Sequence, residues 1–137
     1  MACLYGGQLA PVAEVTLLDA WAAGLASIRR HGIRIERGGA TEVAHVRVAQ
    51  TADEAGPARL ALVLVKSWQT ADAARVLRHC LTEDGVALTL QNGLGNLEIL
   101  QDSLGPARAA QGVTMYGATL LAPGGRLHGL TEAVEGL

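Results

Sequence analysis

The sequence predicts an α/β fold, in which a mostly parallel sheet carries helices on its faces. Short aliphatic runs alternate with segments of helical periodicity, which is the pattern of strand–helix–strand units. The run Leu60–Val65 is continuously aliphatic, as expected of a strand that is buried on both faces of a parallel sheet. A length of 137 residues and an apolar content of 50% suit one domain with a packed core.

The first part of the chain is predicted to contain three strands and one helix. Residues 13–18 form the first predicted strand, and residues 20–31 form a helix with one apolar face. Gly32 is expected to end this helix, because glycine adopts the left-handed conformation that commonly terminates helices. Residues 33–36 and 43–48 alternate apolar and polar side chains, which favours two half-exposed antiparallel strands.

The rest of the chain returns to the alternation of strands and helices. Apolar spacing predicts a helix over residues 70–81, and residues 86–90 form a buried strand after it. Residues 110–115 are the next predicted strand, and Pro123-Gly124-Gly125 predicts a turn between two antiparallel edge strands. Between them, a third helix is predicted from a stripe of leucines, Leu94, Leu97, Leu100 and Leu104.

Charge and composition exclude several classes of protein. The 11 Lys and Arg residues against 13 Asp and Glu residues give a formal net charge of −2, without the basic excess of a nucleic-acid binder. No apolar run approaches the ~20 residues of a membrane-spanning helix, and the chain does not open with a signal-peptide pattern. Cys3 and Cys80 do not make a disulfide framework, which favours a cytoplasmic location. The histidines lack metal-ligand spacing, so no metal site is predicted.

Candidate site residues follow the predicted strands, because ligands of open α/β sheets bind beyond the carboxyl ends of the strands. Asp19 follows the first strand, Lys66 follows the aliphatic run, and Asn92 follows the strand at 86–90. Lys66 is the only lysine in the chain. Its compact ammonium could hold a carboxylate, a carbonyl or a phosphate, although an ordinary strand-end lysine would have the same spacing.

The other candidates have alternative interpretations too. Asn92 lies in Gln-Asn-Gly-Leu-Gly-Asn, where two glycines let the backbone approach a ligand. The same residues also suit a plain turn between a strand and a helix, with Asn96 at the helix terminus. Asp19 could bind the ribose hydroxyls of a dinucleotide, cap the helix that follows, or do both. Trp21 and Trp68 could belong to a core or to a site.

Several segments together resemble the nucleotide-binding domain of the ketopantoate reductase family. The Lys-x-x-Gln pattern at Lys66–Gln69 and the Gln-Asn-Gly-x-Gly-Asn pattern at Gln91–Asn96 are its most specific parts. The resemblance implies a Rossmann-like, doubly wound and mostly parallel sheet. It runs over nearly the whole chain, through Glu14–Asp19, His31–Ile35, Val63–Thr70, Leu88–Asn96 and Gly112–Thr119.

The resemblance also implies an activity and a set of contacts. The family reduces 2-oxo acids, typically 2-dehydropantoate to pantoate in pantothenate biosynthesis, with hydride from NADPH. Lys66 and Asn92 match the catalytic positions that contact the nicotinamide end of the cofactor and the substrate. Ala118 matches a backbone contact beside the nicotinamide, and Ala2 stands at the last glycine of the family's Gly-x-Gly-x-x-Gly motif, where alanine is accepted.

The choice of cofactor departs from the family pattern. Family members that select NADP(H) carry an arginine just past the second strand, and the matching position here is Ala20, preceded by Asp19. A carboxylate at this place favours a free ribose hydroxyl and repels a 2′-phosphate. The family default is therefore NADP(H), whereas Asp19 favours NAD(H).

Both ends of the sequence also depart from the family. The family's first strand and first two glycines have no counterpart before Met1, and its second, helical domain has none after Leu137. We therefore expect residues 1–137 to be a single, partial dinucleotide-binding domain that is inactive by itself. Without the usual first strand, the sheet should expose an edge that a second copy of the chain could cover.

Two other functions fit the same residues. One is a 2-hydroxyacid dehydrogenase of the same superfamily with another substrate. The other is a non-catalytic nucleotide-binding or assembly fragment. The expected partner remains a small-molecule 2-oxo acid substrate, with neither nucleic acid nor membrane.

Overall fold

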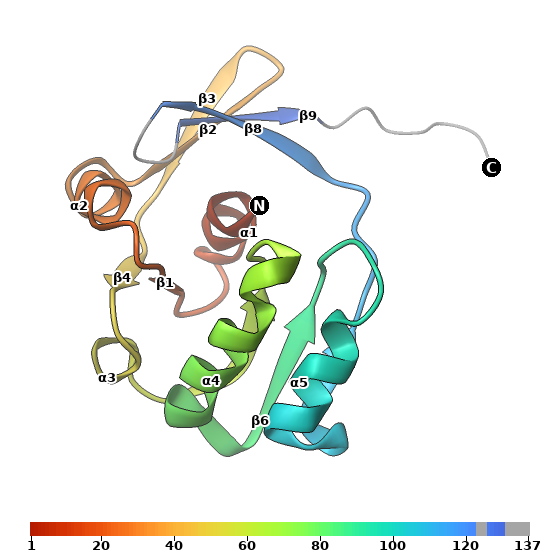
Figure 1. Cartoon of the computed structure of the whole chain (residues 1–137). Coiled ribbons are helices and arrows are strands. Elements are labelled where there is room, and N and C mark those ends of the chain that lie inside the picture. Colours follow the sequence, from red (N-terminus) through yellow and green to blue (C-terminus); the bar gives the residue numbers. More distant parts are fainter. Residues whose placement is uncertain (123–125, 131–137) are drawn as a thin grey trace. The chain divides into compact units, whose positions relative to one another are not determined.

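The computed structural model describes residues 1–122 and 126–130 (Figure 1). These residues belong to two compact units, which we describe separately. The first unit comprises Met1, Cys3–Val48 and the segment that begins at Met115. The second unit comprises Ala2 and Ala49–Thr114.

The first unit is built mainly on a four-stranded sheet. Strand order in this sheet is β3-β2-β9-β8, and a separate two-stranded ladder joins β1 to β4. β2 pairs antiparallel with β3 and parallel with β9, and β8 pairs antiparallel with β9. The elements are α1 (Ala2–Leu9), β1 (Thr16–Leu18), α2 (Ala22–His31), β2 (Ile33–Arg37), β3 (Ala40–Ala44), β4 (Arg47–Ala49), β8 (Gly117–Ala122) and β9 (Arg126–Leu130).

Most of the predicted elements in this unit are confirmed. A strand lies within residues 13–18, α2 follows it, and Gly32 ends α2 with a φ of 72°. The single strand predicted at 43–48 is wrong. β3 ends at Ala44 and β4 begins at Arg47, because the chain changes its pairing partner from β2 to β1 between them. The predicted turn at 123–125 lies outside the described residues, and the strands on either side of it pair antiparallel as expected.

Small residues in α1 allow the helix to pack closely in the first unit. The buried core consists of Leu4, Ile28, Ile33 and Ile35. A Cβ atom added at Gly7 would lie 2.7 Å from Cδ1 of Ile35, which is closer than van der Waals contact allows. A larger residue at this position would therefore force the Ile35 side chain to shift, which glycine avoids.

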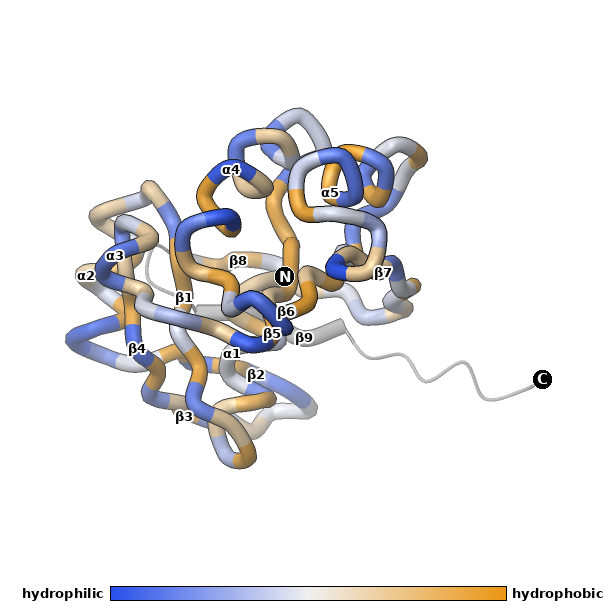
Figure 2. The backbone as a smooth tube through the Cα atoms, turned by 90° about the horizontal axis from the view of Figure 1, so that it is seen from below, coloured by the Kyte–Doolittle hydropathy of each residue, from blue (hydrophilic) through white to orange (hydrophobic). Residues whose placement is uncertain are grey.

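The second unit is a three-stranded parallel sheet with helices. Strand order is β5-β6-β7, and both pairings are parallel. Helices α4 and α5 lie side by side over β6 (Figure 1), and part of β6 is coloured as hydrophobic in Figure 2. The elements are α3 (Ala52–Ala55), β5 (Ala58–Val63), the 3₁₀ turn η1 (Ser67–Gln69), α4 (Thr70–Cys80), β6 (Leu81–Thr89), α5 (Asn96–Leu104), the 3₁₀ turn η2 (Pro106–Arg108) and β7 (Ala109–Gln111).

The α/β class is confirmed, with parallel strands and covering helices. The helix predicted at 70–81 is α4, and the strand at 86–90 lies almost entirely within β6. The strand predicted at 110–115 is wrong beyond Gln111, where β7 ends.

Burial of residues 60–65 on both faces of the sheet is also wrong. The Leu60 side chain is 58% exposed. Among the described strands β5 pairs with β6 alone, so β5 is an edge strand of its sheet rather than a central one.

The leucine stripe provides a matched test of this packing. Leu100 is 0% exposed in α5, whereas Leu94 precedes the helix and is 99% exposed. We expect Leu100→Ala to lower the free energy of unfolding by about 2–5 kcal/mol, because it leaves a cavity. Leu94→Ala should change it by less than about 0.5 kcal/mol. Urea denaturation followed by circular dichroism measures both, and equal effects would contradict this placement of α5.

Candidate functional site

Lys66 lies between β5 and η1 with its side chain exposed. Its backbone is fixed by a reciprocal pair of hydrogen bonds. The Lys66 N–H donates to Oε1 of Gln69 at 3.2 Å, and the Lys66 carbonyl accepts from the Gln69 N–H at 2.8 Å. The Lys-x-x-Gln pattern thus forms a closed turn that follows the carboxyl end of β5.

Asn92 lies in the turn between β6 and α5 and is also exposed. Gly93 and Gly95 in this turn have φ values of 96° and 89°, a conformation that side chains rarely adopt. No atom lies within 4 Å of a Cβ built on either glycine. The backbone of this turn is therefore open to close approach by a ligand.

The structure brings the Lys66 turn and the Asn92 turn together. The Ser67 hydroxyl donates to the Asn92 carbonyl at 3.4 Å, and Nε2 of Gln91 donates to the Val65 carbonyl at 2.7 Å. An exposed ammonium and an exposed carboxamide therefore follow neighbouring parallel strands, as the rule for open α/β sheets predicts. Together they can hold a carbonyl, a carboxylate or a carboxamide.

Beneath these two turns lies a buried polar cluster formed by Thr70, Thr89, Gln91 and Asn96. The exposed fractions of these side chains are 0%, 0%, 9% and 2% in that order. Asn96 begins α5, which confirms its predicted place at a helix terminus. The contribution of the two threonines was missed from the sequence, because nothing in their local pattern marks them. Gln91 and Asn96 were marked only as parts of the glycine-containing motif.

Asp19 lies in the turn that leads into α2. Its Oδ1 atom accepts the Trp21 N–H at 2.8 Å, and the carboxylate remains exposed. Trp21 is itself the N-cap of α2, so this bond does not cap an N–H group of the helix and the capping interpretation is not confirmed. The ribose contact stays a prediction. A carboxylate has further acceptor positions, so one N–H bond leaves it able to accept a hydroxyl as well.

Ala2 and Ala118 lie in different elements. Ala2 is the first residue of α1, and Ala118 lies in β8, opposite Gly129 of β9, where it packs against the core of the first unit. Asp19 and Ala118 belong to the first unit, and Lys66 and Asn92 belong to the second. The four residues are therefore described as two separate groups.

The remaining candidates play packing or surface roles. Burial raises the pKa of the thiol in both Cys3 and Cys80, which keeps these groups protonated and unreactive. Trp68 is 80% exposed and does not belong to a core. Over residues 1–122 and 126–130, no group of three or more potential metal ligands occurs. The same residues include no helix with the length and apolar character needed to cross a membrane.

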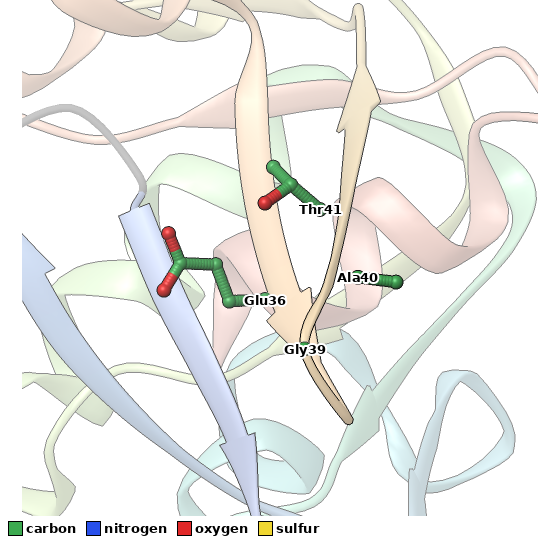
Figure 3. Close-up of a pocket in the computed structure, with 4 residues that line it drawn as sticks. All are labelled: Glu36, Gly39, Ala40 and Thr41. Carbon is green, nitrogen blue, oxygen red and sulfur yellow. The ribbon is translucent and has the colours of Figure 1, made fainter.

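Two hollows in the structure lie outside the predicted site. One, of about 270 Å³, is formed on the β2–β3 hairpin by Glu36, Gly39, Ala40 and Thr41 (Figure 3). The other, of about 300 Å³, is lined by residues of α4 and α5, including Arg75 and Asp102. Neither is lined by a predicted site residue. The candidate site is thus a surface formed by two turns.

The chain belongs to the family described as ketopantoate reductase PanE/ApbA, which matches residues 1–134. It is 38% identical over 123 residues to a 2-dehydropantoate 2-reductase of Halobacterium salinarum, covering 88% of this chain and 39% of that protein. A 2-dehydropantoate 2-reductase of Lactococcus lactis is 26% identical over 113 residues, covering 81% of this chain and 36% of the relative. The chain thus spans about two fifths of these relatives.

Solved structures show the same fold. The 2-dehydropantoate 2-reductase of Geobacter metallireducens matches with a TM-score of 0.77 at 29% identity, covering 92% of this chain and 42% of that one. The protein from Enterococcus faecalis matches with a TM-score of 0.76 at 27% identity, covering 95% and 41%. A D-mandelate dehydrogenase matches with a TM-score of 0.84 at 22% identity, covering 93% and 42%, and this likeness concerns the fold alone.

Proposed function

We propose that the chain is the nicotinamide-nucleotide-binding part of an NAD(P)H-dependent 2-oxo acid reductase, with 2-dehydropantoate as substrate and pantoate as product. The observation that carries the proposal is the meeting of the Lys66 turn and the Asn92 turn, joined by the Ser67 hydroxyl at 3.4 Å from the Asn92 carbonyl. Membership of the ketopantoate reductase family supports the proposal, because Lys66 and Asn92 match the positions that contact the nicotinamide and the substrate in that family.

The residues fit a nicotinamide nucleotide and a 2-oxo acid in their chemistry. When bound, the nucleotide supplies the hydride. The Lys66 ammonium provides a fixed positive charge that stabilises the negative charge developing on the substrate oxygen. The Asn92 carboxamide donates and accepts hydrogen bonds, which suits a nicotinamide carboxamide or a substrate carbonyl. The open backbone at Gly93 and Gly95 leaves room for a ring beside it.

The remaining cofactor contacts of the proposal follow the family pattern. Ala2 begins α1, where unpaired backbone N–H groups favour a pyrophosphate. Asp19 is placed at the adenosine ribose and Ala118 beside the nicotinamide, as the family pattern implies. The substrate is a small molecule and the setting is cytoplasmic pantothenate biosynthesis.

The Lys66 role is testable in a hybrid that replaces the matching segment of the Halobacterium salinarum relative with this chain. Residues 1–137 alone should show no turnover, because hydride transfer also needs a proton donor to the forming alkoxide. In the hybrid, Lys66→Ala should lower kcat/KM for 2-oxo acid reduction, because it removes about 2–4 kcal/mol of transition-state stabilisation. Steady-state kinetics give this value.

The matched control for this substitution is Arg75→Ala. Arg75 is an exposed cation of the same unit, paired with Asp72 in α4, and its removal should leave kcat/KM unchanged. An active hybrid in which Lys66→Ala has no effect would exclude Lys66 from the site.

Cofactor selectivity tests Asp19. We expect the chain to bind NADH about tenfold more tightly than NADPH, ~1.4 kcal/mol, because the carboxylate repels the 2′-phosphate. Asp19→Ala combined with Ala20→Arg should reverse this preference. Asp19→Asn is the control, because it keeps an oxygen for the Trp21 N–H and removes only the charge. Calorimetric titration measures the affinities of the unaltered chain and both variants. A tenfold preference of the unaltered chain for NADPH would exclude Asp19 from the selection of the cofactor.

We also propose that a second copy of the chain covers the edge of β5. The strand pairs with β6 alone among the described strands, and Leu60 on it is 58% exposed. Sedimentation velocity should show a dimer that Leu60→Glu dissociates, because the charge cannot be buried unpaired. Val43→Glu, on the exposed β3 strand of the other unit, is the control that should leave the dimer intact. A monomer at tens of micromolar would contradict the proposal.

A further inference from the structure

The buried polar cluster under the two turns forms a directed chain of hydrogen bonds. Nε2 of Gln91 donates to the Val65 carbonyl at 2.7 Å and to the Thr70 hydroxyl at 3.0 Å. Thr70 has one proton, and its shorter contact is 2.9 Å to Oδ1 of Asn96. The Thr89 hydroxyl donates to Oε1 of Gln91 at 3.0 Å. Each side chain in the cluster is therefore fixed as a hydrogen-bond donor or acceptor by the partner that it contacts.

The orientation of both carboxamides follows from the carbonyls that they face. The Asn96 amide nitrogen donates to the carbonyls of Asn92 at 3.2 Å and Gly93 at 3.4 Å. Turning this amide over would place its oxygen against two carbonyl oxygens, and turning Gln91 over would do the same at Val65. Among the described residues no buried side-chain nitrogen or oxygen lacks a partner, so the cluster is fully satisfied.

The chain of bonds ends on the peptide groups that carry the two candidate residues. The Val65–Lys66 peptide is held on both sides, its carbonyl by Gln91 and its N–H by Oε1 of Gln69 at 3.2 Å. The Asn92 carbonyl is likewise held by the Asn96 amide and by the Ser67 hydroxyl. A peptide plane held on both edges fixes the adjoining backbone dihedrals, and these set the direction of the Lys66 side chain.

We propose that Gln91 is a positioning residue, which orients Lys66 directly and orients Asn92 through Thr70 and Asn96. This role rests on the proposed function, in which Lys66 and Asn92 hold the substrate and the nicotinamide. Gln91 itself is 9% exposed and lies beneath the turns, so it acts through its neighbours. Its carboxamide is suited to this role because it donates to the Val65 carbonyl after β5 and accepts from the Thr89 hydroxyl at the end of β6.

The test uses ¹⁵N-labelled chain 1–137 and two pairs of variants. Gln91→Met removes the carboxamide, and Gln111→Met makes the same change at the exposed last residue of β7. Thr70→Val removes one hydroxyl with little change of shape, and Thr70→Ser retains it. We expect Gln91→Met and Thr70→Val to shift the amide signals of both Lys66 and Asn92. We also expect them to speed hydrogen exchange of the Lys66 N–H about tenfold relative to amides within β6.

The controls separate positioning from a general loss of stability. Thr70→Ser and Gln111→Met should retain the signals of the unaltered chain, whereas a merely structural role would change exchange throughout β6 equally. The proposal is overturned if Gln91→Met leaves the Lys66 amide signal in place, or if Thr70→Val and Thr70→Ser behave alike. If Gln91→Met does not fold, the threonine pair decides the question.

Titration with NADH distinguishes failure of this proposal from failure of the proposed function. We expect Gln91→Met and Thr70→Val to raise the Kd for NADH about tenfold, and Thr70→Ser to change it less than about twofold. The unaltered chain could bind neither NADH nor NADPH while the variants still shift the Lys66 and Asn92 amide signals as expected. In that case the proposed function fails, and the coupling of the two turns through Gln91 stands. If NADH binds equally to all variants, the positioning role is excluded.

Discussion

Burial of polar side chains at the carboxyl ends of β5 and β6 is the constraint on which the second unit depends. Thr70, Thr89, Gln91 and Asn96 are removed from water, and each unpaired group would cost about 1–3 kcal/mol. Every partner in the cluster must therefore be in place at once. This requirement holds the first residue of α4, the first residue of α5 and the last residue of β6 in one arrangement.

The turns above this cluster gain rigidity without being buried themselves. Lys66 and Asn92 remain exposed, yet the peptide groups beside them are held by side chains below. A site of this kind is preorganised by the hydrogen bonds beneath it rather than by an enclosing cavity. The positive φ values at Gly93 and Gly95 follow from the same arrangement, because the chain must leave β6 and enter α5 within a few residues.

The sequence predicted the parts of this arrangement that depend on local pattern. Periodicity located α4 and α5, and the strand-end rule selected Lys66 and Asn92 before their turns were seen to meet. Prediction from the sequence failed where the pairing of strands decides the outcome. It predicted burial for Leu60, which lies on an edge strand, and a single strand at residues 43–48, which belong to two ladders. The hydrogen bonds of Gln91 to Val65 and Thr70 join residues 26 and 21 positions apart, so no local pattern encodes them.

Hydrogen bonding treats differently two candidate residues, Asp19 and Lys66, that the sequence left ambiguous. Asp19 accepts a backbone N–H two residues away, and any aspartate in a turn before a helix can do this, so the bond says little about a ligand. Lys66 differs, because both sides of its preceding peptide are held by glutamine side chains while the residue itself is exposed. These bonds fix the backbone from which the Lys66 side chain starts, as a positioned ammonium requires. The organised surroundings of Lys66, rather than its charge alone, therefore support its place in the proposed site.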